Sequence, residues 1–503
     1  MTSRTEQRRA AMLAALGLGL LADALVRVDG RPGVNVVLWA IAGVVAIVVL
    51  LRNRADPVSR ETRWLLGAAV GFSLPLMLRD ADSLAAISFL SSLLLLGLAA
   101  GRATSAWAVG AHVSEVVVAG FRMAFLCVAG PLAWGRGTPA PSTGARWLRT
   151  AVRGTLMALP ALLVLTALLM SADPLFARLI REIFLIDLER LIEHVVFTAV
   201  IAWLTAGYLR TLLIHDDGIT DSLRVPKPSM PAPEVSIALT LLNVMFAVFM
   251  VVQLRYLFGG AALIEVTPGL TYAEYARRGF FELVVAAALV VPILLLADWL
   301  VTRERQRAYG VLRATMLVLV VLLIGVIASA AYRMRLYETA YGLTELRLYV
   351  SAFIVWLTAV LVWLVLTVLR GRRETFAFAS IVTGLVCVVV LHSLNPHALI
   401  VRRNIDRAVV ATEIDGRYLR TLSADAVPTL LARLDRLPEE ERCGVARMLE
   451  ERWEGERRGG WRTWNLSDWR ARRLVRNAAA PHRAYAGCEP TASAHDSRKR
   501  ATN

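Results

Sequence analysis

Four short polar segments in the second half of the chain carry the residues whose types and spacing could do chemistry. They are SADPLFARL from Ser171, TYAEYARRGFFEL from Thr271, YGLTELRLY from Tyr341 and LNPHALIVRRN from Leu394. Helix N-termini beside arginines bind phosphate or carboxylate groups, so these segments raise the hypothesis of an anion or lipid-headgroup site. The candidate ligand-binding residues are Glu274, Arg277, Arg278, Tyr341, Glu345, Arg347, Asn395 and Arg402.

The same segments also have a purely structural interpretation, in which they begin and anchor helices. Asp173 and Asn395 each precede a proline, which suits a cap followed by the first helical residue. Thr271 and Thr344 are followed closely by glutamates, as in capping boxes and acidic first turns. The predicted helix caps are therefore Asp173, Thr271, Thr344 and Asn395. Capping and anchoring explain more of the pattern than a ligand site does, and both alternatives stay open.

One sharper hypothesis concerns the connector YETAYGLTELRLY. Glu345 and Arg347 are expected to form one polar cluster at the membrane surface together with Glu274, Arg277 and Arg278. The tyrosines of the connector suit the headgroup depth of a bilayer, where aromatic residues gather. The planar fork of an arginine would let such a cluster grip a carboxylate or phosphate.

Other kinds of chemistry are not indicated. Lysine occurs only at Lys227 and Lys499, outside any Gly-Lys-Ser/Thr phosphate loop, and no Gly-x-Ser-x-Gly elbow is present. The four cysteines show no CxxC spacing and the seven histidines are scattered, so no metal and no cofactor is predicted. The net charge of +16 would suit nucleic acid, but the arginines flank apolar runs, where they orient membrane helices. No nucleic-acid partner is predicted.

The elements that must position the polar segments are predicted to be membrane-spanning helices. Hydrophobic residues make up 57% of the chain and the mean hydropathy is +0.56. A crossing needs about 20 predominantly apolar residues. Eleven segments suit a crossing: 10–26, 34–51, 64–78, 84–100, 151–172, 194–214, 235–258, 279–301, 314–331, 348–369 and 376–394. The prediction is an all-α integral membrane protein with about eleven transmembrane helices and all four polar segments on one face.

Residues 106–134 are predicted to form an interfacial or re-entrant segment rather than a crossing. His112, Glu115 and Arg122 would otherwise place charges at several depths of the bilayer. With this choice, more arginines lie on the side of the N-terminus. The expected orientation has the N-terminus in the cytoplasm and the C-terminal module outside, in a bacterial inner (cell) membrane.

The expected domain organisation follows from the apolar runs and from a change of composition after the last one. It comprises an N-terminal membrane region at 1–135 with about four crossings, a Gly/Pro loop at 136–150, a membrane core at 151–410 with about seven crossings, a C-terminal helical module at 411–477 and a disordered tail at 478–503.

Three short helices are predicted in the C-terminal module. Ser423 and Ser467 suit caps of the first and the third helix. Trp461, Trp464 and Trp469 are expected to belong to the small core of the module rather than to contact the bilayer interface.

The strings AYGLTELRLY, LNPHALIVRRNI and TYAEYARRGFFEL resemble the bacterial multi-pass membrane protein family labelled domain of unknown function 4153/4173. The resemblance covers roughly Pro174 to Asn404 and extends to RTWNLSDWRARR. His397 stands where the family frequently has an acid, which argues against a role that needs a carboxylate there. The resemblance implies a multi-pass membrane fold and supplies no reaction.

These observations favour a non-enzymatic membrane protein with a sensory or envelope-associated role. Its expected partners are membrane lipids and another envelope or signalling protein that would bind the C-terminal module. The alternative is a transporter, or an enzyme that acts on a lipid-linked substrate at the extracytoplasmic face. The sequence names no ligand.

Overall fold

The computed structural model describes residues 4–27, 31–52, 59–104, 113–131, 162, 165–166, 168–176, 188–213, 230–265, 280–301, 306–411, 414–455, 460–477 and 481–485. Helices account for nearly all of the regular structure in these ranges, which hold one isolated β-bridge, between Met230 and Val301. The predicted all-α class is confirmed.

Nine of the described helices are long and apolar enough to cross a membrane. They are α1 (Arg4–Ala22) with its π-helical continuation η1 (Asp23–Arg27), α2 (Val34–Arg52), α5 (Asp82–Thr104), α9 (Leu188–Leu213), α11 (Ala232–Glu265), α13 (Phe280–Leu300), α14 (Gln306–Tyr341), α15 (Glu345–Leu366) and α16 (Phe376–Leu394). Their apolar composition and exposed large side chains suit a lipid environment. An integral membrane protein is therefore confirmed.

The two remaining predicted crossings have different outcomes. The segment 64–78 forms two helices, α3 (Arg60–Ser73) and α4 (Pro75–Leu78), which are separated at Leu74 because a proline follows. The segment 151–172 lies mostly outside the described residues. The total of about eleven crossings stays a prediction.

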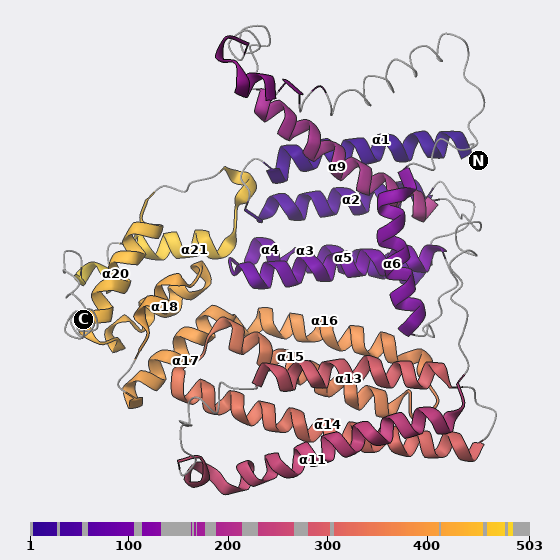
Figure 1. Cartoon of the computed structure of the whole chain (residues 1–503). Helices are drawn as coiled ribbons and strands as arrows, with labels where there is room; N and C mark the ends of the chain where they lie inside the picture. The colour runs from indigo at the N-terminus through magenta and orange to yellow at the C-terminus, as the bar shows by residue number, and fades with distance from the viewer. Residues whose placement is uncertain are drawn as a thin grey trace.

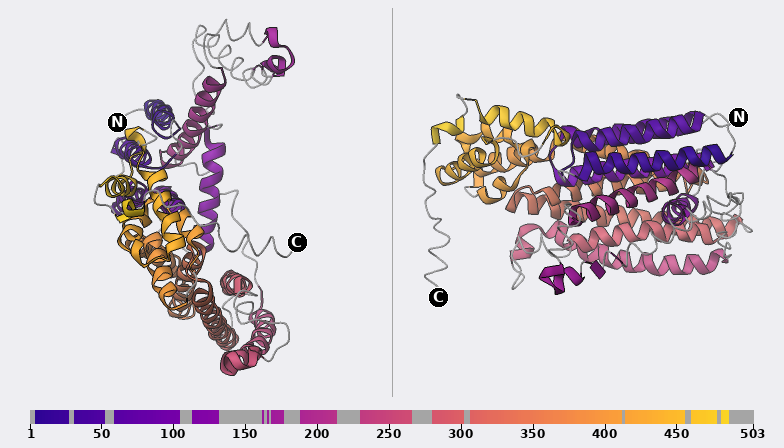
Figure 2. Two further views of the ribbon diagram at one scale, coloured as in Figure 1. Left: turned by 90° about the vertical axis from the view of Figure 1, so that its left-hand side faces the viewer. Right: turned by 90° about the horizontal axis from the view of Figure 1, so that it is seen from above.

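The helix α6 (Val113–Ala129) belongs to the segment predicted to be interfacial or re-entrant. It runs across the other membrane helices rather than along them (Figures 1 and 2). An interfacial helix would have this orientation, and the assignment stays a prediction.

The membrane helices form two bundles, each with a hydrophobic core of its own. In the N-terminal bundle α1 packs against α9 and α3 against α5, around Ala15, Leu50, Leu66 and Leu209. The C-terminal bundle contains α11, α13, α14, α15 and α16, and α14 packs against α11, α13 and α15 (Figure 1). Contacts of α16 with α5 and α6 connect the two bundles.

The C-terminal module is a layer of short helices at one end of the membrane helices, and the N-terminus of the chain lies at the other end (Figure 1). It contains α17 (Pro396–Ala411), α18 (Gly416–Thr421), η4 (Ala424–Ala426), α19 (Val427–Ala432), η5 (Leu434–Arg436), α20 (Glu439–Trp453), η6 (Trp461–Thr463), α21 (Leu466–Val475) and η7 (Pro481–Tyr485). Its core unites Ile400 and Ile405 of α17 with Val427, Leu430 and Leu449. By its packing, α17 therefore belongs to the module.

The tryptophans of the module do not lie where the sequence suggested. Trp461 is 62% exposed and Trp469 is 44% exposed, whereas Trp453 of α20 is 2% exposed. The prediction that Trp461 and Trp469 form core is wrong, because α21 directs Ala471 and Val475 inward instead.

One cysteine of the module is engaged covalently. Cys443 of α20 is disulfide-bonded, whereas Cys127 of α6 and Cys387 of α16 are free. The fourth cysteine of the sequence, Cys488, lies outside the described residues. Disulfides form and persist in oxidising compartments.

Candidate functional site

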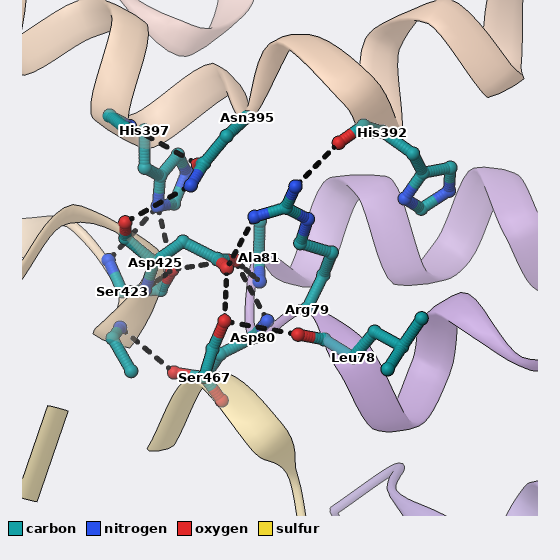
Figure 3. Close-up of polar contacts among 12 residues, drawn as sticks. Leu78, Arg79, Asp80, Ala81, His392, Asn395, His397, Ser423, Asp425 and Ser467 are labelled. Carbon is teal, nitrogen blue, oxygen red and sulfur yellow. Dashed lines mark hydrogen bonds and ion pairs between the residues drawn. The ribbon is translucent and has the colours of Figure 1, made fainter. Parts of the chain in front are cut away.

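The turn between α4 and α5 offers backbone donors to the module. Arg79 has an extended backbone and ends α4, and Asp82 begins α5 three residues later. The intervening N–H groups of Asp80 and Ala81 have no partner within a helix, so they need an acceptor from elsewhere. The carboxylate of Asp425, which is 4% exposed, accepts both, with N–O distances of 2.8 and 3.1 Å (Figure 3).

Three further groups surround the Asp425 carboxylate (Figure 3). The hydroxyl of Ser467 donates to its Oδ1 atom, and the guanidinium of Arg79 lies 3.5 Å from the same atom. Ser423 Oγ lies 3.5 Å from Oδ2. Hydrogen bonds to a buried carboxylate are charge-assisted and cost much to leave unmade. We use the name Asp425 junction for the residues that surround this carboxylate together with those, described below, that contact them: Arg79, Asp80, Ala81, His392, Asn395, His397, Ser423, Asp425 and Ser467.

A second contact of the junction has the reverse arrangement, in which the carboxylate belongs to the α4–α5 turn and the amide to the module. Asp80 Oδ2 accepts a hydrogen bond from the Ala424 N–H at 3.0 Å, so the turn and the module exchange carboxylate–amide bonds. Burial raises the pKa of the Asp80 carboxyl, the Ala424 hydrogen bond opposes this rise, and the neighbouring Asp425 adds to it.

The end of α16 supplies the third side of the junction. Asn395 adopts a left-handed conformation (φ 49°), which ends α16 and lets α17 begin at Pro396. Its Nδ2 donates to the Asp425 carbonyl at 3.3 Å, and its Oδ1 accepts from the Ala398 N–H at 3.3 Å. Arg79 donates to the His392 carbonyl at 2.7 Å. The junction therefore joins α4, α16 and the module (Figure 3).

His397, which is 5% exposed, connects the module to the start of α15. Its Nδ1 atom accepts a hydrogen bond from the Ser423 N–H at 3.0 Å, and Ser423 Oγ lies 2.8 Å from the same nitrogen. An imidazole nitrogen that accepts from an amide carries no proton, so the proton of the neutral ring is on Nε2. Nε2 lies 3.4 Å from Oε1 of Glu345.

The order Ser423, His397, Glu345 has the residue types of a catalytic triad, but the geometry does not suit nucleophilic catalysis. The base of a triad needs a free lone pair facing the hydroxyl. Here the Nδ1 lone pair receives the backbone N–H of Ser423, and Ser423 Oγ in turn accepts from the Asp425 N–H at 3.3 Å. Ser423 is also 8% exposed. The three residues are arranged to hold the module in place.

The α21 helix is attached to α4 by an asparagine. Asn465 Nδ2 donates to the carbonyls of Leu76 and Arg79, at 3.2 and 2.7 Å. Its Oδ1 accepts from the Ser467 and Asp468 N–H groups and caps α21. The prediction that Ser467 caps this helix is therefore wrong, because Asn465 is the cap and the Ser467 hydroxyl lies within hydrogen-bonding distance of Asp425 Oδ1 and the Leu78 carbonyl.

A second polar cluster lies between α14 and α15, and we call residues 337–349 the tyrosine connector. The guanidinium carbon of Arg347 lies 3.9 Å from the centre of the Tyr337 ring and 5.9 Å from that of Tyr341. The same guanidinium donates to the Gly342 carbonyl. The tyrosines thus hold an arginine across a tight turn.

Asn404 of α17 fastens the tyrosine connector to the module. Its side-chain amide donates to the Leu343 carbonyl at 2.9 Å and accepts from the Leu343 N–H at 2.7 Å. Gly342 has φ +78°, and a Cβ atom on it would lie 2.8 Å from Asn404 Oδ1. The Tyr418 hydroxyl accepts from the Glu345 N–H at 2.8 Å.

The residues predicted to bind a ligand have separate positions. Glu345 and Asn395 lie at or beside the Asp425 junction, Tyr341 and Arg347 lie in the tyrosine connector, and Arg402 is exposed on α17. The other ligand-binding candidates, Glu274, Arg277 and Arg278, lie outside the described residues, as does the predicted cap Thr271. A single cluster of Glu345 and Arg347 with the segment from Thr271 therefore stays a prediction.

The four predicted caps can be described only in part. Thr344 Oγ1 accepts from the Arg347 N–H at 3.5 Å, and Asp173 Oδ1 accepts from the Leu175 N–H at 2.8 Å. Asn395 caps α17 while it ends α16.

Sequence reasoning missed the residues that build the junction. Arg79, Asp80 and Asp425 were not singled out, although the string RDADS between two apolar segments is unusually polar. The string SADA from Ser423 pairs with it only in the folded chain. Among the described residues, no group of three or more His, Cys, Asp or Glu side chains could hold a metal ion.

Fold and site together define a polytopic α-helical membrane protein with a helical module packed on one end of its membrane helices. The chain belongs to the family described as Domain of unknown function (DUF4153), whose model matches residues 66–432. This confirms the family resemblance. The match begins nearer the N-terminus than expected, so it includes Arg79 and Asp80, and it ends before the RTWNLSDWRARR segment. No curated protein and no solved structure gave a significant match.

Proposed function

We propose that the protein is a non-enzymatic, envelope-associated membrane protein whose module holds the two helix bundles together and relays changes in the module to them. The observation that carries this proposal is the position of Asp425. Its carboxylate binds the α4–α5 turn of the N-terminal bundle, while Asn395 and His397, just after the C-terminal bundle, hold the segment that contains it. A partner that moved this segment would act on both bundles at once.

The proposed orientation has the module on the extracytoplasmic side of a bacterial inner membrane and the N-terminus in the cytoplasm. Two observations support it. The N-terminus and the module lie at opposite ends of the membrane helices (Figure 2). Cys443 of the module is disulfide-bonded, which suits an oxidising compartment. The expected partner of the module is another envelope or signalling protein.

Cysteine labelling tests the orientation in intact cells. Single cysteines replace the exposed Trp461 of the module or Gly310 at the start of α14, in a chain with Cys127→Ser and Cys387→Ser. An impermeant thiol reagent is expected to label Trp461→Cys and not Gly310→Cys. The reverse pattern would place the module in the cytoplasm.

Distances between the bundles test the relay. Spin labels are placed at Val45 of α2 and Val355 of α15, which are 54% and 64% exposed. Pulsed electron–electron double resonance on the purified protein is expected to give a narrow distribution of the distance between the two labels. Asp425→Ala should broaden or shift it, whereas the exposed control Glu451→Gln should not. Identical distributions in all three proteins would contradict the proposed coupling.

A deletion strain distinguishes the proposed role from its alternative. We expect the deletion strain and a strain whose Asp425→Ala protein is present in the membrane at normal abundance to show the same change of the envelope. Neither strain should accumulate a single envelope precursor. Reproducible accumulation of a single lipid-linked intermediate would instead indicate an enzyme, and specific loss of uptake would indicate a transporter. Full complementation by Asp425→Ala would overturn the proposal.

A further inference from the structure

A cavity of about 330 Å³ lies between α1, α2, α4, α5 and α9, and the Asp425 carboxylate is not part of its lining. Apolar side chains make up nearly all of its lining, among them Val36 and Trp39 of α2, Phe89 of α5, and Phe197 and Ile201 of α9. Four of the five helices are candidate membrane spans. The cavity therefore lies among candidate membrane-spanning segments.

The cavity is elongated along the helix axes. On α5 its lining extends from Asp82 through Ala85 to Phe89. The seven rises between Asp82 and Phe89 correspond to about 10 Å along the helix, at 1.5 Å per residue. Asp82 begins α5 at the end of the bundle where the module lies, so the cavity runs from that membrane surface toward the bilayer interior. A slot of this shape and depth suits one hydrocarbon chain.

The wall of the slot is held by interactions of its own. The indole N–H of Trp39 donates to the Leu18 carbonyl at 2.9 Å, which fixes the ring that faces the cavity. Phe89 is 43% exposed, so the slot borders the lipid-facing surface of α5. A chain could therefore enter sideways from the bilayer without separation of the helices.

The charges at the mouth of the slot indicate which headgroup the bound lipid should carry. Among the described lining residues, Asp82 is the only charged one, and its side chain is exposed at the first turn of α5. Close to the lining residue Val26, Arg27 is bonded to Asp23 and Glu193, so its positive charge is compensated and does not offset the Asp82 carboxylate. A primary ammonium would complement this charge and donate hydrogen bonds to it.

We propose that the slot binds one acyl chain of an aminophospholipid and that the Asp82 carboxylate recognises the ammonium of its headgroup. Apolar contact supplies the affinity, because the chain fills a cavity lined by side chains of comparable polarity. The Asp82 carboxylate determines the headgroup specificity.

Native mass spectrometry of the purified full-length protein tests both parts. The protein is stripped of lipid in detergent and offered phosphatidylethanolamine, phosphatidylglycerol or phosphatidylcholine with identical chains. We expect one phosphatidylethanolamine to be retained several-fold better than the other two lipids. Asp82→Asn should keep lipid binding and lose the headgroup preference. Equal retention of all three lipids by the wild type would overturn the role of Asp82.

A pair of substitutions on α5 tests the slot itself. Ala85→Phe should fill the cavity and abolish retention, whereas Leu90→Phe, at a position 63% exposed on the same helix, should not. Equal retention by both variants would mean annular lipid only.

A measurement on the unaltered cavity covers the case in which Ala85→Phe does not fold. Brominated phosphatidylethanolamine should quench the fluorescence of Trp39, measured as the difference between the wild type and Trp39→Phe. Quenching no stronger than with brominated phosphatidylglycerol would contradict the proposal.

Discussion

The Asp425 junction and the tyrosine connector both gather polar side chains at the module end of the bundle, but they act over different ranges of the chain. In the connector, Arg347 reaches Gly342, five residues earlier, and stacks on tyrosines at the end of α14. In the junction, Asp425 binds amides 345 and 344 residues away. A local cluster can rigidify a turn, whereas a long-range cluster decides how separate bundles are placed.

The two clusters also differ in what their loss would leave behind. Asp425 is 4% exposed and accepts the backbone N–H groups of Asp80 and Ala81, which lie between two helices. Arg347 is only partly buried, and water can replace its contacts. An unpaired buried donor costs far more than a lost contact at the surface. The four predictions below test this contrast, from the largest effect to the smallest.

The largest effect is expected from Asp425→Ala. The substitution leaves the N–H groups of Asp80 and Ala81 without their acceptor and removes the carboxylate that pairs with Arg79. Removal of one partner from a buried charged pair costs roughly 3–5 kcal/mol. Thermal unfolding in detergent measures the loss, with the exposed Glu451→Ala as control. A change as small as in the control would mean that the junction is not a buried network.

A medium effect is expected from Gly342→Ala in the connector. Gly342 has φ +78°, and an added Cβ would meet Asn404 Oδ1 at 2.8 Å. A non-glycine residue in this conformation costs about 1–3 kcal/mol. Gly371→Ala is the matched control, because Gly371 has φ +83° and nothing within 4 Å of the added atom. The difference between the melting temperatures of the two variants isolates the contact with Asn404. Equal losses of stability would show that the Asn404 side chain moves aside at little cost.

A small effect is expected from Arg347→Lys. Lysine keeps a cation over the Tyr337 ring but cannot reproduce the planar fork that reaches the Gly342 carbonyl. A partly exposed cation–π contact contributes about 0.5–1 kcal/mol, so the loss of stability should not exceed this range. Stability and activity in cells are measured together. Lost activity at unchanged stability would indicate that Arg347 grips an anionic ligand rather than the turn.

The smallest effect is expected from the pH dependence of Asp80. Because burial raises the pKa of this carboxyl in the folded state, the folded protein holds the proton more tightly than the unfolded chain. The contribution of Asp80 to stability is therefore greatest at low pH and is lost as pH rises through its raised pKa. The Asp80→Asn variant should lack this dependence, so its stability relative to the wild type should increase from acidic to neutral pH. A constant difference would contradict the raised pKa.

Part of the candidate site could be predicted from the sequence, because the residues involved are close together in the chain. Thr344 stands directly before Glu345, so a cap and its helix could be paired by their spacing. Asn395–Pro396 marked a break between α16 and α17 for the same reason. The partners of these residues were not readable. Nothing in the spacing of Asn404 reveals that its amide would bind the backbone of Leu343, and Arg347 was expected to face a ligand rather than two tyrosines.

The sequence by itself determined the class of this protein, its family and most of its membrane helices. Long apolar runs can satisfy their backbone within a bilayer only as helices, so composition and length suffice for that prediction. Tertiary structure alone decided that two bundles form, that α17 joins the module, and that Asp425 meets the α4–α5 turn. The contact of Asp425 with the turn joins residues more than 300 positions apart, and this pairing depends on which buried amides lack an acceptor once the helices have packed.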